Sequence, residues 1–156
     1  MKIGIIGAMD IEVEELINSM DDIKKEDISR IDFYEGKLQD KDVVVAKCGV
    51  GKVHAAVCTQ TMILKYAPDA IINIGVAGSL SNELDFADIV ISDGVVQHDF
   101  DVSPFGKPVG LITGIELIKI PCSEELVKRL LSAAEILEDT NIAVGTVASG
   151  DQFISS

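Results

Sequence analysis

The chain has 156 residues, 47% of them hydrophobic, and its 26 Asp and Glu against 13 Lys and Arg give a formal net charge of −13. This length suffices for one domain with a substantial core and not for two ordinary ones, so we expect residues 1–156 to form a single domain. The acidic balance without a basic patch excludes nucleic-acid and anionic-membrane partners, and no apolar run reaches the ~18–20 residues of a bilayer span, so we expect a cytoplasmic protein.

The opening stretch, MKIGIIGAMDIEVEEL, predicts a buried strand over residues 2–6, a Gly7-Ala8 turn and an amphipathic helix. Ligands of open α/β sheets bind beyond the carboxyl ends of strands, which makes Glu12 the first candidate for a functional carboxylate. The alternative is that Glu12 and the acidic residues around it only complement the positive end of the helix dipole.

Residues 21–29 are acidic and polar, and we expect a solvated connector there. The alternating runs 31–38 and 43–48 predict a hairpin. The segment CGVGKVHAAV, residues 48–57, places two glycines before a helix that runs to about Tyr66. Its spacing is not that of a Walker motif, which needs Gly at Ala46 and a hydroxyl at Val53. We expect the inward side of this helix to carry Val53, Ala56, Val57 and Leu64.

Residues 70–74 form a run that is apolar apart from Asn73, which is typical of a central strand covered on both faces. The run leads directly into the small-residue turn Gly75-Val76-Ala77-Gly78. Small residues there leave volume that a flat ligand could fill, or they allow a neighbouring helix to pack closely.

Strands are predicted at 88–92 and 141–147, and residues 94–97 continue the first strand or re-enter the sheet. An amphipathic helix capped by Ser123 is predicted before the last strand. The segment HDFDVSPFG, residues 98–106, offers an imidazole and carboxylates, but no second His or Cys group completes a shell, so we expect no metal. The cysteines are widely spaced and suggest neither a disulfide framework nor a zinc site. This element order predicts an α/β layer fold with a mixed sheet.

Four stretches in this order resemble the 5′-methylthioadenosine/S-adenosylhomocysteine nucleosidases of the purine nucleoside phosphorylase-like superfamily. They are KIGIIGAMDIEVEEL, the pair CGVGKVHAA and INIGVAG, HDFDVSPFG, and ASGDQFI, and they cover essentially the whole chain. The resemblance implies a three-layer α/β/α fold with a mixed central sheet, truncated at its carboxyl end. It also implies hydrolysis of the N-glycosidic bond of an adenine thionucleoside, without a cofactor.

By the same resemblance, Glu12 activates water, Phe153 stacks on adenine and the Ile154 backbone binds the base edge. The other substrate-binding positions it implies are Ala8, Met9, Val50, Val76 and Gly78. Val102 and Phe105 resemble residues that reach into the partner subunit's pocket, which implies a homodimer.

The chain departs from the family pattern at Val76, where relatives commonly carry a serine, and at Thr113, where a proline is frequent. A Met-Glu pair that grips the ribose and a Ser-Asp pair that protonates adenine have no counterpart in it, so we expect low activity from this chain alone. Neither Arg30 nor Arg129 lies in a glycine turn, which favours water over phosphate as nucleophile. The alternatives are a nucleoside phosphorylase or futalosine-type nucleosidase of the same fold, or a non-catalytic nucleoside-binding protein.

Overall fold

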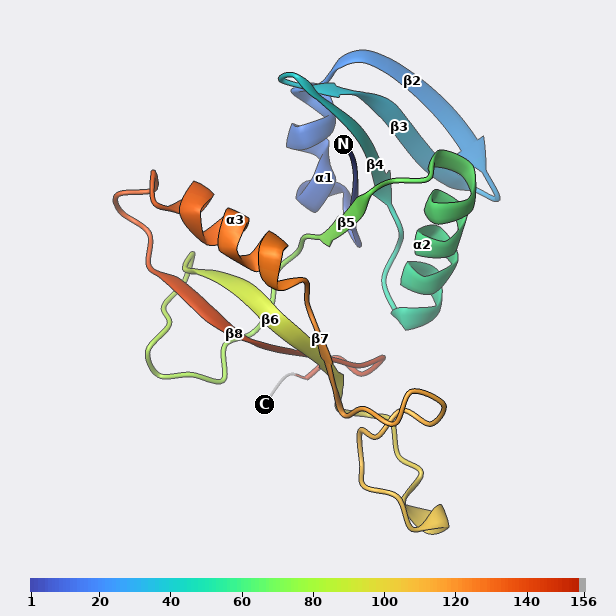
Figure 1. Ribbon diagram of the computed structural model, residues 1–156, viewed down its shortest axis with the longest axis vertical. Coiled ribbons are helices and arrows are strands. Elements are labelled where there is room, and N and C mark those ends of the chain that lie inside the picture. Colours follow the sequence, from blue (N-terminus) through green and yellow to red (C-terminus); the bar gives the residue numbers. More distant parts are fainter. Residues whose placement is uncertain (155–156) are drawn as a thin grey trace. The chain divides into compact units, whose positions relative to one another are not determined.

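The structure is a computed structural model that describes residues 1–154 (Figure 1). Its residues form two compact units, one over Met1–Val76 and one beginning at Ala77, and each is described by itself. The first unit contains β1 (Lys2–Gly7), α1 (Asp10–Asn18), β2 (Asp21–Ile28), β3 (Ile31–Leu38), β4 (Lys41–Lys47), α2 (Lys52–Tyr66) and β5 (Ala70–Asn73).

The first unit is built on a five-stranded mixed sheet with the strand order β2-β3-β4-β1-β5. β1 pairs in parallel with both β4 and β5, whereas β3 is antiparallel to β2 and β4. Helices α1 and α2 cover opposite faces of this sheet (Figure 1). A strand covered on both faces is apolar along its whole length, which is the pattern of β4 from Val43 to Ala46.

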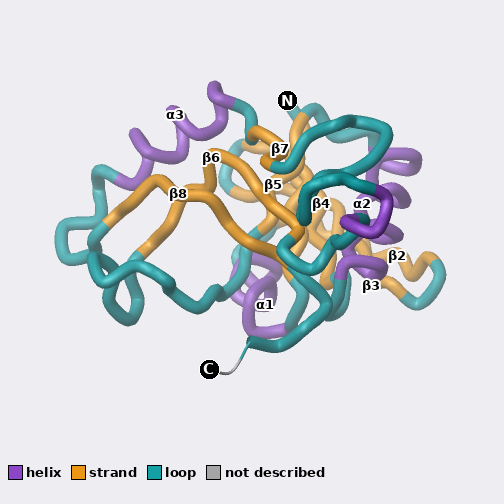
Figure 2. The backbone as a smooth tube through the Cα atoms, turned by 90° about the horizontal axis from the view of Figure 1, so that it is seen from below, coloured by secondary structure: helices purple, strands orange, loops and turns teal. Residues whose placement is uncertain are grey.

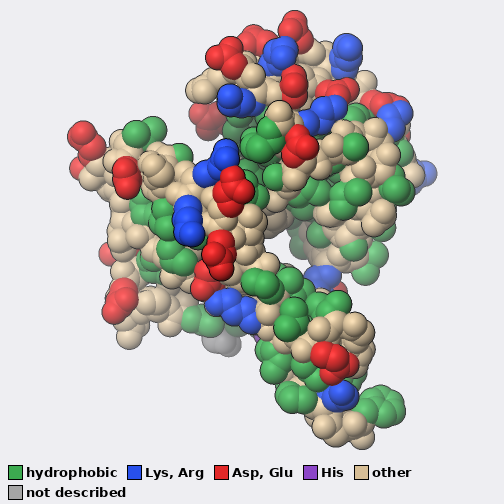
Figure 3. Space-filling view, viewed as in Figure 1, with side chains coloured by type: hydrophobic (Ala, Val, Ile, Leu, Met, Phe, Trp, Pro, Cys, Tyr) green, Lys and Arg blue, Asp and Glu red, His purple; other side chains and the backbone are tan. Residues whose placement is uncertain are grey.

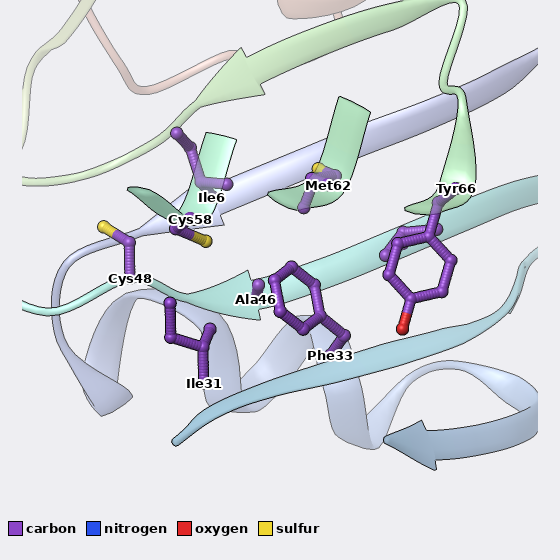
Figure 4. Close-up of a cluster of buried hydrophobic side chains, with 9 residues drawn as sticks. Ile6, Ile31, Phe33, Ala46, Cys48, Cys58, Met62 and Tyr66 are labelled. Atoms are coloured by element: carbon purple, nitrogen blue, oxygen red, sulfur yellow. The ribbon is translucent and has the colours of Figure 1, made fainter. Parts of the chain in front are cut away.

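Two hydrophobic clusters fill the spaces between the sheet and its helices. On one face Phe33 and Val44 pack with Met62 and Tyr66 of α2 (Figure 4), and on the other Val13 of α1 belongs to the second cluster. Burial in the first cluster raises the pKa of the Cys58 thiol to about 11. This thiol is therefore a packing residue rather than a nucleophile.

The prediction for the inward face of α2 was wrong. Val53 and Leu64 are 71% and 77% exposed, and Ala56 and Val57 are also exposed. The side chains that face the sheet are those of Cys58, Met62 and Tyr66. Because α2 carries apolar residues on both sides, its periodicity alone does not select the side that packs.

Two strand predictions also need correction. Residues 21–28, expected as a connector, form strand β2 at one end of the sheet, where a row of charged side chains protects an exposed edge. Strand β5, expected to be central, lies at the other end. Its apolar character has the expected cause, cover on both faces, because Ile71 packs on the α2 side and Ile74, directly after the strand, packs on the α1 side.

The lysines of the β2 region do not form a basic patch. Lys25 pairs with Asp32 and Lys65 pairs with Glu26, each at 2.8 Å. On the face shown in Figure 3, basic and acidic side chains are interspersed over the first unit.

The second unit contains a three-stranded mixed sheet with the order β7-β6-β8. β6 and β8 are parallel and lie side by side in both views (Figure 1, Figure 2), while β7 is antiparallel to β6. Residues 94–97, expected to continue the strand at 88–92 or to re-enter the sheet, continue it as one strand, β6, with an irregularity between Ser92 and Gly94. The elements are β6 (Ile89–Gln97), a 3-10 turn (Ser103–Phe105), β7 (Lys119–Pro121), α3 (Glu124–Ala134) and β8 (Ile142–Ser149).

The predicted cap of α3 is confirmed, because the Ser123 hydroxyl oxygen accepts a hydrogen bond from the Leu126 backbone N–H at 3.4 Å. The predicted α/β class with a mixed sheet is also confirmed, with the strands hydrogen-bonded as two sheets, one in each unit. None of the helices within residues 1–154 combines the length and apolar character that crossing a bilayer requires.

The core of the first unit can be tested at Phe33, which is 0% exposed and lies 5.4 Å from the Tyr66 ring, centroid to centroid. We expect Phe33→Ala to lower the free energy of unfolding by ~3–5 kcal/mol, since it removes buried surface and leaves a cavity. Urea denaturation measures the loss. Phe86, which is 98% exposed, provides the matched control, and equal midpoints for the Phe33→Ala and Phe86→Ala proteins would contradict the described core.

Candidate active site

Glu12 lies in the first turn of α1, directly after the turn that leaves β1. Its Oε2 atom accepts hydrogen bonds from the backbone N–H groups of Ala8 and Met9, at 2.6 and 2.9 Å. Its Oε1 atom accepts a third from the backbone N–H of Val76, at 3.2 Å. The structure thus brings together four residues singled out from the sequence, because Ala8, Met9 and Val76 surround the carboxylate of Glu12.

Helix capping accounts for only part of this arrangement. A glutamate in the first turn that accepts the N–H of the capping residue is a common device at helix starts, and the bond from Met9 is of that kind. The bond from Val76 comes from the segment after β5. Of the neighbouring acids, Asp10 pairs with Lys47 at 2.7 Å and Glu14 is exposed. Glu12 is therefore held differently from the acids that only decorate the helix start.

The Glu12 carboxylate retains room for one more donor. An ionised carboxylate offers about four acceptor positions, two on each oxygen. The three N–H groups occupy both positions of Oε2 and one of Oε1, counted over residues 1–154. The remaining position on Oε1 can accept a proton from water, which is what a general base requires.

The ends of three parallel strands meet at this edge of the sheet. The Cys48 N–H donates to the Gly7 carbonyl at 2.8 Å, and the Ile74 N–H donates to the Ile6 carbonyl at 2.9 Å. The Gly49-Val50-Gly51 turn follows β4 at the same edge, with the Val50 side chain 71% exposed. Val50 therefore shares a sheet edge with Glu12.

The remaining candidate residues belong to the second unit, and the structure places them at its surface. Phe153 and Ile154 follow the carboxyl end of β8 and are 95% and 63% exposed. Gly78 is exposed in the segment before β6. Val102 is half-buried before the 3-10 turn, and Phe105 within that turn is 86% exposed.

The loop that begins at His98 is tied to the loop after β8. The His98 backbone N–H donates to the Ser149 carbonyl at 3.1 Å, and the Asp151 N–H donates to Oδ2 of Asp99 at 2.8 Å. His98 and Asp99 thus hold the segment that precedes Phe153 in place. Within residues 1–154, no group of three or more His, Cys, Asp or Glu side chains is arranged to hold a metal ion.

An open groove of about 650 Å³ lies on the α1 face of the first unit. Glu12 borders it, but most of its lining is aliphatic, with side chains such as Ile5, Leu16 and Ile72. Aliphatic walls offer few groups for the hydroxyls of a sugar. The candidate catalytic position is therefore the edge at the strand ends, where the backbone N–H groups gather.

Sequence reasoning missed two parts of this site, the Val76 backbone N–H and the space at Gly75. An alanine Cβ at Gly75 would lie 2.8 Å from Oε1 of Glu12, so the carboxylate itself occupies the volume expected for a ligand or a packed helix. The sequence signal that could have indicated this space is the glycine just after β5, the strand that runs parallel to β1. Which side chain fills that space depends on tertiary structure.

The sequence of the chain matches the profile of the phosphorylase superfamily over residues 2–156. The chain belongs to this superfamily.

Within the superfamily, the chain is 45% identical over 154 residues to a 5′-methylthioadenosine/S-adenosylhomocysteine nucleosidase of Shewanella sediminis. The match covers 99% of this chain and 66% of that protein. The fold is similar to that of the corresponding nucleosidase of Neisseria meningitidis, solved with methylthio-immucillin-A, with a TM-score of 0.96, 35% identity, and coverage of 99% of this chain and 67% of that one. The chain thus spans about 66% of the length of the curated relatives it matches.

Two further structures bear on the choice of substrate. The nucleosidase of Colwellia psychrerythraea, solved with adenine, matches with a TM-score of 0.96 and 33% identity, over 100% of this chain and 64% of that one. A futalosine hydrolase mutant of Helicobacter pylori matches with a TM-score of 0.89 and 35% identity, over 99% of this chain and 70% of that one. The nucleoside phosphorylase-like fold expected from the sequence is confirmed.

Proposed function

We propose that this chain forms the amino-terminal part of an enzyme that hydrolyses the N-glycosidic bond of 5′-methylthioadenosine and S-adenosylhomocysteine. The observation that carries the proposal is the Glu12 carboxylate, held by three backbone N–H groups with one acceptor position free. The similarity to nucleosidases solved with adenine and with methylthio-immucillin-A supports an adenine nucleoside as the substrate.

In the proposed reaction, Oε1 of Glu12 accepts a proton from water as the water oxygen bonds to the anomeric carbon of the sugar. The bond between that carbon and the adenine nitrogen breaks, its electron pair leaves with adenine, and adenine takes up a proton. In the nucleosidases that the chain resembles, a Ser-Asp pair supplies this proton. The chain itself contributes the base and holds it in place through the Ala8, Met9 and Val76 N–H groups.

The remaining candidate residues have proposed roles in binding. Phe153 would stack on the purine, since an exposed aromatic face suits a flat base, and the Ile154 backbone would bind the base edge. Met9 and Val50 would border the sugar and thioalkyl tail. Val76 contributes a backbone N–H to Glu12, which its replacement of the usual serine leaves intact.

Water is the proposed nucleophile. Phosphate sites commonly use arginine, and Arg129 pairs with Glu125 on α3 at 2.6 Å, while Arg30 lies in the turn between β2 and β3. The second candidate is futalosine hydrolysis, favoured by the similarity to the Helicobacter pylori enzyme. That reaction would use the same base on a different nucleobase.

We also propose a cytoplasmic homodimer, in which Phe105 reaches the partner's pocket. Phe105 is 86% exposed and stands on a three-residue turn, so its ring is available to a neighbouring molecule. An exposed aromatic side chain of this kind is typical of interface anchors.

The assay for the proposal uses the chain extended by the remaining third of a relative and follows adenine release from methylthioadenosine, with and without inorganic phosphate, and nucleobase release from futalosine. We expect adenine release that is independent of phosphate. A requirement for phosphate would identify a phosphorylase instead, and release from futalosine alone would favour the second candidate.

A further inference from the structure

The position that controls the Glu12 carboxylate most directly is Gly75, at the end of the β5 segment. A Cβ built on Gly75 would lie 2.8 Å from Oε1 of Glu12, 3.3 Å from its Cδ and 3.7 Å from its Oε2. All three nearest atoms therefore belong to one carboxyl group. Because glycine has no side chain, position 75 leaves a space, and the Glu12 carboxyl group fills it.

The other glycines near the site are different. At Gly7 a Cβ would lie 2.7 Å from Cγ1 of the core residue Val13, and 3.1 and 3.4 Å from Cβ and Oε2 of Glu12, so Gly7 makes room first for the packing of α1 and not for the carboxylate alone. At Gly78 no atom lies within 4 Å. Gly75 also lacks the positive φ that would make glycine necessary for backbone reasons. Space for the carboxylate is thus the specific requirement at this position.

We propose that Gly75 is a positioning residue for Glu12, which keeps the carboxylate on its three backbone N–H groups by leaving room for it. A methyl group at Gly75 overlaps the far end of a flexible side chain rather than backbone. The carboxyl group would turn away, whereas the fold would stay. The donors from Ala8 and Met9 would then lose their acceptor.

The test compares amide chemical shifts of Ala8 and Met9 in the isotope-labelled full chain. Because the ends of β1 and β5 are paired, the added methyl group also lies near these residues in space, and the Glu12→Ala background separates its direct effect from that of the carboxylate. We expect Gly75→Ala to shift both resonances toward their positions in Glu12→Ala, and Gly78→Ala to leave them in place. In the Glu12→Ala background, adding Gly75→Ala should move neither resonance further.

Two outcomes would overturn the proposal: unchanged Ala8 and Met9 resonances in Gly75→Ala, or an equal shift in the Glu12→Ala background. If Gly75→Ala fails to fold, the double variant decides. Folding of Gly75→Ala with Glu12→Ala assigns the defect to the overlap with Glu12 and supports the proposal, and its failure to fold contradicts it.

A second measurement rests on the proposed function and uses the protein extended by the remaining third of a relative. There Gly75→Ala should lower kcat for adenine release by ~10²-fold with little change in KM, because it misplaces the base. Gly145→Ala in β8, where a Cβ would lie at an ordinary 3.6 Å from Cγ1 of Val90, should retain the kcat of the parent. If the unaltered protein releases no adenine, the proposed function fails while the chemical-shift comparison still tests Gly75. A kcat retained by Gly75→Ala in an active protein would overturn the positioning role.

Discussion

Replacing Glu12 by Gln is expected to lower the rate of adenine release by ~10²–10⁴-fold, the usual contribution of a general base. The amide has nearly the shape of the carboxylate, and its oxygen can still accept the N–H groups of Ala8 and Met9. Its NH2 group would then face the Val76 N–H, donor against donor, and could not take a proton from water. The measurement is kcat for adenine release from methylthioadenosine by the chain extended with the remaining third of a relative.

The matched control is Glu14→Gln, which changes the same kind of residue on the exposed side of the same helix. We expect it to keep the rate of the parent protein. Equal rates for Glu12→Gln and the parent would remove Glu12 from the mechanism. Equal losses in both variants would show that the charge of the helix start, rather than the held carboxylate, supports the activity.

The second large effect concerns the part of the relatives that this chain does not span. The match covers 66% of the Shewanella sediminis nucleosidase, and we expect the chain alone to turn over methylthioadenosine poorly. Joining the remaining third of that relative to the chain should raise turnover by ~10²–10⁴-fold, the typical contribution of a general acid. Adenine release at saturating substrate measures the gain.

The control for this fusion is the same added segment with the Asp of its Ser-Asp pair changed to Asn. It should restore the length and packing of the relatives without restoring the rate. If the fusion gives no gain in turnover, the account of the missing acid is wrong. If the Asn form is as active as the Asp form, the gain comes from folding rather than from proton donation.

The elements of the fold were largely predictable because their patterns are local. The buried run of β4 and the glycine turns appear directly in the sequence. The errors at α2 and β2 in the first unit have tertiary causes. The packing side of α2 is ambiguous because Val53 and Cys58 lie on opposite sides of a helix that is apolar on both. The charged strand β2 carries no apolar alternation, because it protects a sheet edge.

The sequence selected the residues of the candidate site but did not indicate the hydrogen bonds between them. Strand-end logic selected Glu12, and the family resemblance selected Met9 and Val76 beside it. Nothing local to Val76 shows that its N–H reaches a carboxylate of α1, because that contact depends on β5 pairing beside β1. The role of Gly75 was hidden for the same reason.

The most direct test of the account is a crystal structure of the protein with methylthioadenosine bound. The account predicts an ordered water molecule within hydrogen-bond distance of Oε1 of Glu12 and in line with the anomeric carbon, with the carboxylate still on its three N–H groups. A nucleoside bound with its anomeric carbon away from Glu12, or a Glu12 side chain turned into bulk solvent, would contradict it.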